Sequence, residues 1–292
     1  NTCNNTVTGI YLYSSSNNNT VTGNTCNNNN NGIRLYSSSD NTVTGNTCNN
    51  NNDGIYLYSS SNENTVTGNT CNNNSNYGIY LYSSSNNTVT GNTCNNNSYG
   101  IYLYSSSNNT VTGNTYNNNS DYGIYLSSSS NENTVTGNTC NNNSYGIYLA
   151  SSSNNTVTGN TCYNNNSYGI YLTSSSNNNT VTGNTCNNNS YGIRLYSSSN
   201  NTVTGNTCNN NNDTGIYLYS SSNNTVTGNT CIRGTGQTSD YTSSQYTILL
   251  AGSSNNYNLI SSNNCMGKAV EVNGGTGNSA WGNKFDNTDD LP

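Results

Sequence analysis

N-N-T-V-T-G-N-T-C, residues 18–26, is the stretch that decides the fold, because close copies of it recur along most of the chain. Each copy is followed by a loop rich in Asn and Ser, then by Gly-Ile-Tyr-Leu or a close variant, and then by a run of serines. A repeat of roughly 20–50 residues is typical of solenoids, propellers and arrays. The valine of the copies returns every 22–24 residues, at Val21, Val43, Val66, Val89, Val111, Val135, Val157, Val181, Val203 and Val226.

Two segments of each repeat have the pattern of β-strands. In Gly-Ile-Tyr-Leu-Tyr the aliphatic residues alternate with tyrosine, a period of two, and Thr-Val-Thr consists of β-branched residues. The Asn, Ser and Gly segments between them vary in length and suit turns. The repeat therefore predicts an all-β, single-chain parallel β-solenoid of about 12–13 coils, each of 22–24 residues, in which Val, Ile and Leu point inward.

The pattern divides the chain into three parts. Residues 1–231 form the regular array, and residues 232–247 interrupt it as an inserted loop. Residues 248–292 contain degenerate coils, in which Ile260 takes the valine position, and end in an acidic tail. We expect this last part to cap the solenoid, because a terminal repeat needs a more polar outer surface than an internal one.

The composition excludes several classes of function. The 292 residues contain 5 Lys and Arg and 11 Asp and Glu, which gives a net charge of −6. This weak negative charge disfavours nucleic acid as a partner. No apolar run is long enough to span a membrane. The chain has no His, the commonest acid–base group and metal ligand, and its acidic residues occur singly. We therefore predict a protein that is not an enzyme, with no catalytic residue, cofactor or metal.

Cysteine recurs at one position of the repeat, and only Tyr116 interrupts the column. Strict alternation from the valine would place this column outside, whereas a bend at the Gly-Asn step would place it inside. Buried free thiols and disulfides between neighbouring coils are both open, because in-register neighbours lie within disulfide range. The predicted ladder comprises Cys3, Cys26, Cys48, Cys71, Cys94, Cys140, Cys162, Cys186, Cys208, Cys231 and Cys265.

Asparagine is placed as regularly as cysteine. The Asn of each Gly-Asn-Thr-Cys is expected to form a ladder of stacked amides inside the turn. Asn96 and Asn108 begin N-x-S/T sequons in variable loops and are candidate glycosylation sites. Many cysteines together with sequons favour an extracellular location.

Two outward stripes are candidate binding surfaces. The Thr-x-Thr pairs that flank each valine resemble ice-binding surfaces, although β-propensity alone accounts for them. Arg34 and Arg194 enter the tyrosine stripe, and contiguous exposed aromatic surface marks an interface. The tyrosine stripe is the predicted assembly face and includes Tyr56, Tyr58, Tyr80, Tyr82, Tyr102, Tyr104, Tyr217 and Tyr219.

The repeat N-x-V-x-G-N-x-C followed by G-I-Y-L-x-S-S-S-N-N resembles right-handed parallel β-helix repeats of archaeal and bacterial surface proteins, including relatives of the periplasmic copper-maturation factor. In character it is closest to Cys-containing sheath and surface-layer proteins of methanogenic archaea. The resemblance implies a structural subunit of an extracellular sheath or surface layer, whose partner is itself, with glycans as further partners. The alternative is an ice- or polysaccharide-binding solenoid, and a carbohydrate-active enzyme ranks below both.

Overall fold

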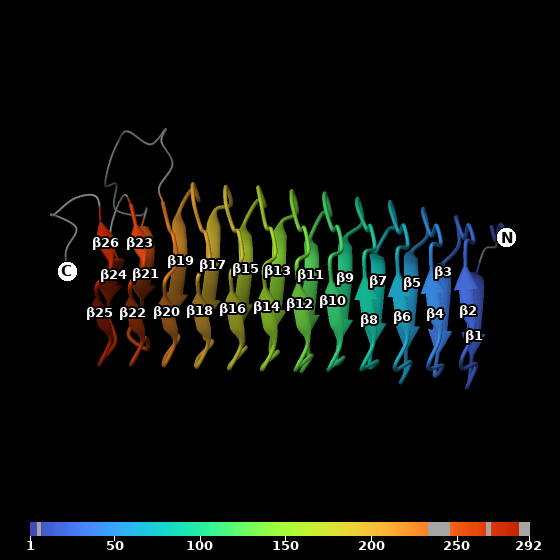
Figure 1. Ribbon diagram of the computed structural model, residues 1–292, viewed down its shortest axis with the longest axis horizontal. Coiled ribbons are helices and arrows are strands. Elements are labelled where there is room, and N and C mark those ends of the chain that lie inside the picture. The colour runs from blue at the N-terminus through green and yellow to red at the C-terminus, as the bar shows by residue number, and fades with distance from the viewer. Residues whose placement is uncertain (5–6, 233–245, 267–269, 286–292) are drawn as a thin grey trace. The chain divides into compact units, whose positions relative to one another are not determined.

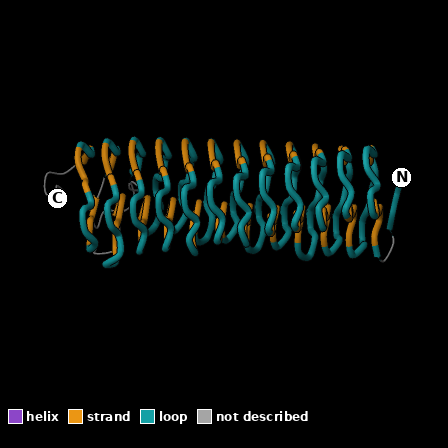
Figure 2. Tube along the Cα trace, turned by 90° about the horizontal axis from the view of Figure 1, so that it is seen from below, coloured by secondary structure: helices purple, strands orange, loops and turns teal. Residues whose placement is uncertain are grey.

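The computed structural model describes residues 1–4, 7–232, 246–266 and 270–285, and the chain forms two compact units, residues 1–143 and 144–292. Within the described residues the secondary structure consists of strands and loops (Figure 2), and none of it is a helix capable of crossing a membrane. The strands of each unit stack coil upon coil (Figure 1). The prediction of an all-β parallel solenoid is therefore confirmed.

Residues 1–143 contain one long and one short strand per coil, and each kind pairs in parallel with its own copies. The long strands, in sheet order, are β1 (Thr8–Tyr13), β3 (Asn31–Tyr36), β5 (Asp53–Tyr58), β7 (Tyr77–Tyr82), β9 (Tyr99–Tyr104) and β11 (Tyr122–Ser127). The short strands are β2 (Thr20–Thr22), β4 (Thr42–Thr44), β6 (Thr65–Thr67), β8 (Thr88–Thr90), β10 (Thr110–Thr112) and β12 (Thr134–Thr136).

Residues 144–292 repeat this arrangement. The long strands are β13 (Tyr145–Ala150), β15 (Tyr168–Thr173), β17 (Tyr191–Tyr196), β19 (Thr214–Tyr219), β21 (Tyr246–Ala251) and β24 (Val270–Asn273). The short strands are β14 (Thr156–Thr158), β16 (Thr180–Thr182), β18 (Thr202–Thr204), β20 (Thr225–Thr227), β22 (Leu259–Ser261) and β25 (Ser279–Trp281). A further pair is formed by β23 (Asn264–Cys265) and β26 (Lys284–Phe285).

The core consists of columns of identical side chains. Ile55 pairs with Ile79 and Leu57 with Leu81, and the same registry holds on the short strands. These aliphatic side chains are fully buried, whereas the tyrosines between them are only partly covered. A one-residue slip would turn the whole aliphatic set outward, so the period-two pattern fixes the register.

Polar ladders line the turns. Asn69 donates to Asn92 Oδ1 from its backbone nitrogen at 2.9 Å and from Nδ2 at 3.0 Å, and Nδ2 also donates to the carbonyl oxygen of Val43 at 2.9 Å. The predicted amide ladder is thus confirmed. Two further asparagine ladders, not predicted from the repeat, include Asn64 with Asn87 and Asn74 with Asn97. Buried serines form a fourth polar column, in which the backbone nitrogen of Ser61 donates to Ser84 Oγ of the next coil. These bonds satisfy polar groups that would otherwise be buried without partners.

The cysteine column lies inside the coil, which settles its orientation. The turn that reverses the alternation contains Gly68 in the left-handed region, at φ +61°. Gly54 lies so close to the column that an added Cβ would approach Cys71 Cβ to 2.9 Å. All eleven cysteines are free thiols in this structure, so the disulfide alternative finds no support here. Tyr116 occupies the same column and is fully buried.

The proposed division into three parts stays a prediction. Residues 233–245, most of the expected inserted loop, lie outside the described residues, as does the acidic tail from residue 286 onward. Beyond the loop, Ile260 pairs with Val226 and takes the valine position, as expected for a degenerate coil.

Candidate functional site

Stacked tyrosine rings cover the outer side of the long strands in residues 1–143. The column between the Ile and Leu positions is the most regular. The ring centroids of Tyr56 and Tyr80 lie 4.8 Å apart, those of Tyr80 and Tyr102 5.1 Å, and those of Tyr102 and Tyr125 4.7 Å, with interplanar angles of 7°, 5° and 4°. The coil spacing sets this repeat, because each tyrosine stands on its own copy in the next coil.

Two more tyrosine columns flank the first. Tyr82 stacks on Tyr104 at 5.0 Å, and Tyr77 lies 5.1 Å from Tyr99. Neighbouring rings cover much of one another's faces, so these tyrosines are only partly exposed. Burial raises the pKa of Tyr99 and Tyr102 to about 12. We call this surface the tyrosine face of residues 1–143.

Residues 144–292 carry their own tyrosine face with the same three columns. Tyr148 and Tyr171 lie 5.1 Å apart between the Ile and Leu positions. Tyr168 and Tyr191 are 5.2 Å apart in the column before the glycine. The predicted assembly residues all lie in these two faces, where each is partly buried by its stacked neighbours. Self-assembly through them stays a prediction.

Arg34 replaces a tyrosine in the middle column. Its Cζ lies 5.3 Å from the ring centroid of Tyr11 in the previous coil and 5.4 Å from that of Tyr56 in the next coil, with Tyr58 at 5.5 Å. These rings hold the guanidinium by cation–π attraction. Arg34 donates no hydrogen bond within the described structure. Its Nε is buried without a partner, whereas the Nη groups reach solvent.

Asp53 lies beside Arg34, at the start of the next long strand. Its Oδ2 accepts a hydrogen bond from Asn31 Nδ2 at 3.1 Å, whereas its Oδ1 is buried without a hydrogen-bond partner. Burial raises the pKa of Asp53 to about 6, and hydrogen bonding and the nearby Arg34 only partly oppose the shift. A carboxyl group with this pKa can take up or release a proton near neutral pH.

Residues 144–292 contain a second cluster of the same composition. The Cζ of Arg194 lies 5.5 Å from the Tyr171 ring and 5.1 Å from the Tyr217 ring, and Nη1 donates to the Tyr168 hydroxyl. Its Nε, like that of Arg34, is buried without a partner. Asp213 accepts a hydrogen bond from Thr214 Oγ1 at 3.1 Å and another from Tyr191.

The two clusters combine a guanidinium, a carboxyl group and tyrosine hydroxyls, a set able to bind an anionic group and to transfer protons. The sequence analysis placed both arginines in the tyrosine stripe but regarded the acids as isolated. A signal was present, because Asp53 and Asp213 each follow their arginine by 19 residues, less than one repeat. In a solenoid that spacing puts the two side chains on adjacent coils.

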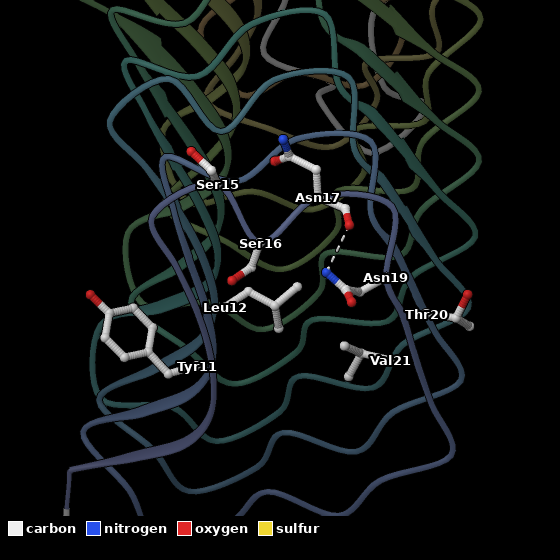
Figure 3. A pocket seen from close by; sticks show the side chains of 8 residues that line it. All are labelled: Tyr11, Leu12, Ser15, Ser16, Asn17, Asn19, Thr20 and Val21. Carbon is white, nitrogen blue, oxygen red and sulfur yellow. Dashed lines mark hydrogen bonds between the residues drawn. The ribbon is translucent and has the colours of Figure 1, made fainter.

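An open pocket of about 450 Å³ lies at the first coil. Leu12 and Val21 point into the coil interior there, Tyr11 points outward, and Asn19 donates to the backbone of Asn17 (Figure 3). Its lining combines the end of the aliphatic core with Ser and Asn and contains no charged side chain. This pocket opens beside the aliphatic core of the first coil, and its lining lacks the groups of a catalytic site.

The candidate glycosylation sites lie where the sequence placed them. Asn96 and Asn108 are exposed at loop tips and adopt left-handed backbone conformations, at φ 58° and 57°. Both side chains point away from the buried amide ladders, which use neighbouring asparagines instead. Glycosylation itself stays a prediction.

Solved structures similar to this one include epimerases and an alginate lyase. The Azotobacter vinelandii mannuronan C-5 epimerase AlgE6 A-module aligns with a TM-score of 0.72 and 16% identity, covering 95% of this chain and 79% of that one. The periplasmic alginate epimerase AlgG aligns with a TM-score of 0.59 and 17% identity, over 91% and 76%. An alginate lyase from Paenibacillus sp. str. FPU-7 aligns with a TM-score of 0.61 and 13% identity, over 92% and 98%.

These structures contradict the prediction that the chain is not an enzyme. Identities of 13–17% show the fold alone, and the structures that share it include epimerases and a lyase. The prediction rested on the lack of His and on acidic residues that occur singly along the chain. It did not include the cluster that stacking forms from Arg34, Asp53 and tyrosines of successive coils.

A comparison with curated protein sequences gives no match. The comparisons do not support the sheath and surface-layer character that the repeat sequence led us to expect. They do support the likeness to the copper-maturation factor. A family described as periplasmic copper-binding protein (NosD) matches residues 1–144 and 133–291. These matches span nearly the whole chain, so the chain belongs to the NosD family of parallel β-helix proteins.

Proposed function

We propose that this protein is a carbohydrate-active β-helix, which binds an extended polysaccharide along its tyrosine faces and acts on it there. The observation that carries the proposal is the stacking of tyrosines at 4.7–5.1 Å in the middle column of residues 1–143. Such a surface offers hydroxyl groups at a regular spacing similar to the advance per sugar of an extended glycan. A regular polymer is therefore its natural ligand.

The hydroxyls suit the chemistry of sugars. Each phenol both donates and accepts a hydrogen bond, and tyrosine is in the donating form at neutral pH because its ordinary pKa is about 10. The Arg34 and Arg194 clusters place a cation and a carboxyl group within each face. The similar folds of epimerases and a lyase that act on alginate support this function over a sheath subunit.

The location proposed for this protein follows its relatives. The NosD family is described as periplasmic, and so is the alginate epimerase AlgG. We therefore place this protein outside the cytoplasm, in a compartment where polysaccharides are met. A more specific position at the cell surface or in a sheath is not part of the proposal.

The residues do not fit the copper site that the family's name implies. Soft thiolates suit copper, but in the described part of the chain no three His, Cys, Asp or Glu side chains converge on one point. The cysteines stand in a single buried column, and burial raises the pKa of Cys71 well above its ordinary value, which opposes thiolate formation.

Binding to defined polysaccharides tests the proposal. Titration calorimetry with alginate, polygalacturonate and neutral glucans is expected to show binding to at least one polymer. The triple variant Tyr58→Phe/Tyr82→Phe/Tyr104→Phe keeps the rings and removes three hydroxyls. At roughly 1 kcal/mol for each hydrogen bond, it should bind about 100-fold more weakly.

A matched control lies on the same coils. Thr65→Val/Thr88→Val/Thr110→Val removes three hydroxyls from the short strands and should leave the affinity unchanged. Proton NMR of the recovered polymer, read for inverted C-5 centres and for new chain ends, measures the activity. Failure to bind any polymer, or equal losses in both triple variants, overturns the proposal.

A further inference from the structure

The two arginines share a feature that stacking alone does not require. Tyrosine rings hold Arg34 and Arg194, yet neither guanidinium forms an ion pair within the described structure, and both Nε atoms are buried without a partner. Arg34 also makes no hydrogen bond through its Nη groups. A guanidinium carries five N–H donors in a planar fork that matches a carboxylate. Most of this capacity is unused.

The nearby acids, Asp53 and Asp213, do not form ion pairs with these guanidinium groups within the described structure. Asp53 Oδ2 takes a hydrogen bond from Asn31 Nδ2 at 3.1 Å, and Asp53 Oδ1 is buried without a hydrogen-bond partner. Asp213 takes hydrogen bonds from the hydroxyls of Thr214 and Tyr191. In both clusters neutral donors engage the carboxyl group, so the arginine stays available although an acid lies beside it.

We infer that Arg34 and Arg194 are two equivalent recognition sites for carboxylate groups of an acidic polysaccharide, and that they select uronate-bearing polymers over neutral ones. The inference rests on the proposed function and names its substrate class. The rings fix each guanidinium in advance, so little side-chain entropy is lost when a carboxylate binds. The flanking tyrosine hydroxyls would then bind the sugar hydroxyls on either side.

One polymer in two forms provides the test. Alginate and carboxyl-reduced alginate share a backbone and differ in carrying carboxylates or alcohols. The wild-type protein is expected to bind alginate at least tenfold more tightly than the reduced polymer, since a charge-assisted hydrogen bond is about twice as strong as a neutral one. Arg34→Gln/Arg194→Gln should bind both polymers with the weaker affinity, and Arg34→Lys/Arg194→Lys should fall between.

The outcomes separate the two proposals. If neither polymer binds, the proposed function fails. If wild type binds both equally, or if the glutamine variant keeps the preference, the carboxylate sites fail while polysaccharide binding stands. A sulfated dextran that competes as strongly as alginate would show a general anion site and overturn the uronate assignment. Unchanged near-ultraviolet circular dichroism of the variants, dominated by stacked tyrosines, verifies that the face is intact.

Discussion

The long and the short strands of one coil turn the same kind of residue inward and different kinds outward. In residues 1–143, Ile and Leu of the long strands and Val of the short strands are buried together. The long strands expose tyrosine and one arginine, which form the tyrosine face. The short strands expose threonine alone, which forms the threonine face.

The difference separates the residues that the fold requires from those to which we assign the proposed function. Thr beside Val is sufficient for a stable outer strand, and the threonine face shows that a coil needs no more. Stacked rings, an arginine with free donors and an acid with a raised pKa are therefore additions, and they all lie on one face. Ice binding by the threonine face stays a prediction. A solution of the protein that shows no thermal hysteresis would contradict it.

The largest loss of stability is expected from disrupting the buried asparagine ladder, which supports the tyrosine face and the threonine face alike. Asn92 Oδ1 accepts hydrogen bonds from the backbone nitrogen and the Nδ2 of Asn69, at 2.9 and 3.0 Å. Asn92→Ala leaves these buried donors without a partner and should cost about 4 kcal/mol in the free energy of unfolding. Urea unfolding followed by circular dichroism measures it.

The control for Asn92 lies in the same coil. Asn96→Gly changes an exposed asparagine whose φ of 58° glycine readily adopts, and it should cost less than about 0.5 kcal/mol. Equal losses of unfolding free energy for the two variants would show that the buried amide ladder contributes no more to stability than an exposed asparagine. The interpretation that this ladder supports both faces would then be wrong.

The second-largest effect is the pH dependence of stability, which should arise on the tyrosine face alone. The short strands of residues 1–143 carry no ionisable side chain. The pKa of Asp53 is raised from 3.8 to about 6, so the folded state binds the proton more tightly than the unfolded state. Stability should fall as pH rises from about 4 to 6, and Asp53→Asn should gain up to about 3 kcal/mol at pH 7.

Thermal unfolding of wild type and Asp53→Asn between pH 4 and 7.5 measures this difference. At pH 4 the two proteins should nearly coincide, and they should separate as the pH rises. Asp40→Asn changes an exposed loop carboxylate and serves as the control. A gap between wild type and Asp53→Asn that stays constant with pH would contradict the raised pKa.

A smaller effect compares a tyrosine inside the coil with one on the tyrosine face. The Tyr116 hydroxyl is fully buried and has no hydrogen-bond partner. Tyr116→Phe removes this unpaired group and should stabilise the protein by about 1–2 kcal/mol. Tyr104→Phe, on the tyrosine face, should change stability little. Destabilisation by Tyr116→Phe in chemical unfolding would indicate that the buried hydroxyl has a partner.

The smallest effect is expected on the threonine face itself. Thr110→Val keeps the β-branched shape and should change the unfolding free energy by less than about 0.5 kcal/mol. Its neighbour Val111 is fully buried, so Val111→Thr should cost about 2 kcal/mol by burying a hydroxyl. Similar costs at both positions would mean that the inward and outward assignment is wrong.

Much of the fold was predictable because the physics is local and repeated. The alternation of Ile, Tyr and Leu fixed which side chains of each long strand are buried, and the recurrence of Asn69 and its copies predicted an amide ladder. The orientation of cysteine was not predictable from alternation, because it depends on the backbone angles at Gly68. The two additional asparagine ladders were missed because their residues lie in segments of variable length.

By itself, the sequence determined the solenoid, its inward columns and its outward stripes, since a period of two and a repeat of 22–24 residues leave little freedom. Only the tertiary structure decided which residues meet. Arg34 and Asp53 are separated by 19 residues along the chain, but they become neighbours once their coils stack. The proposed site lies between neighbouring coils, where contacts depend on the pitch and turns of the stacked coils.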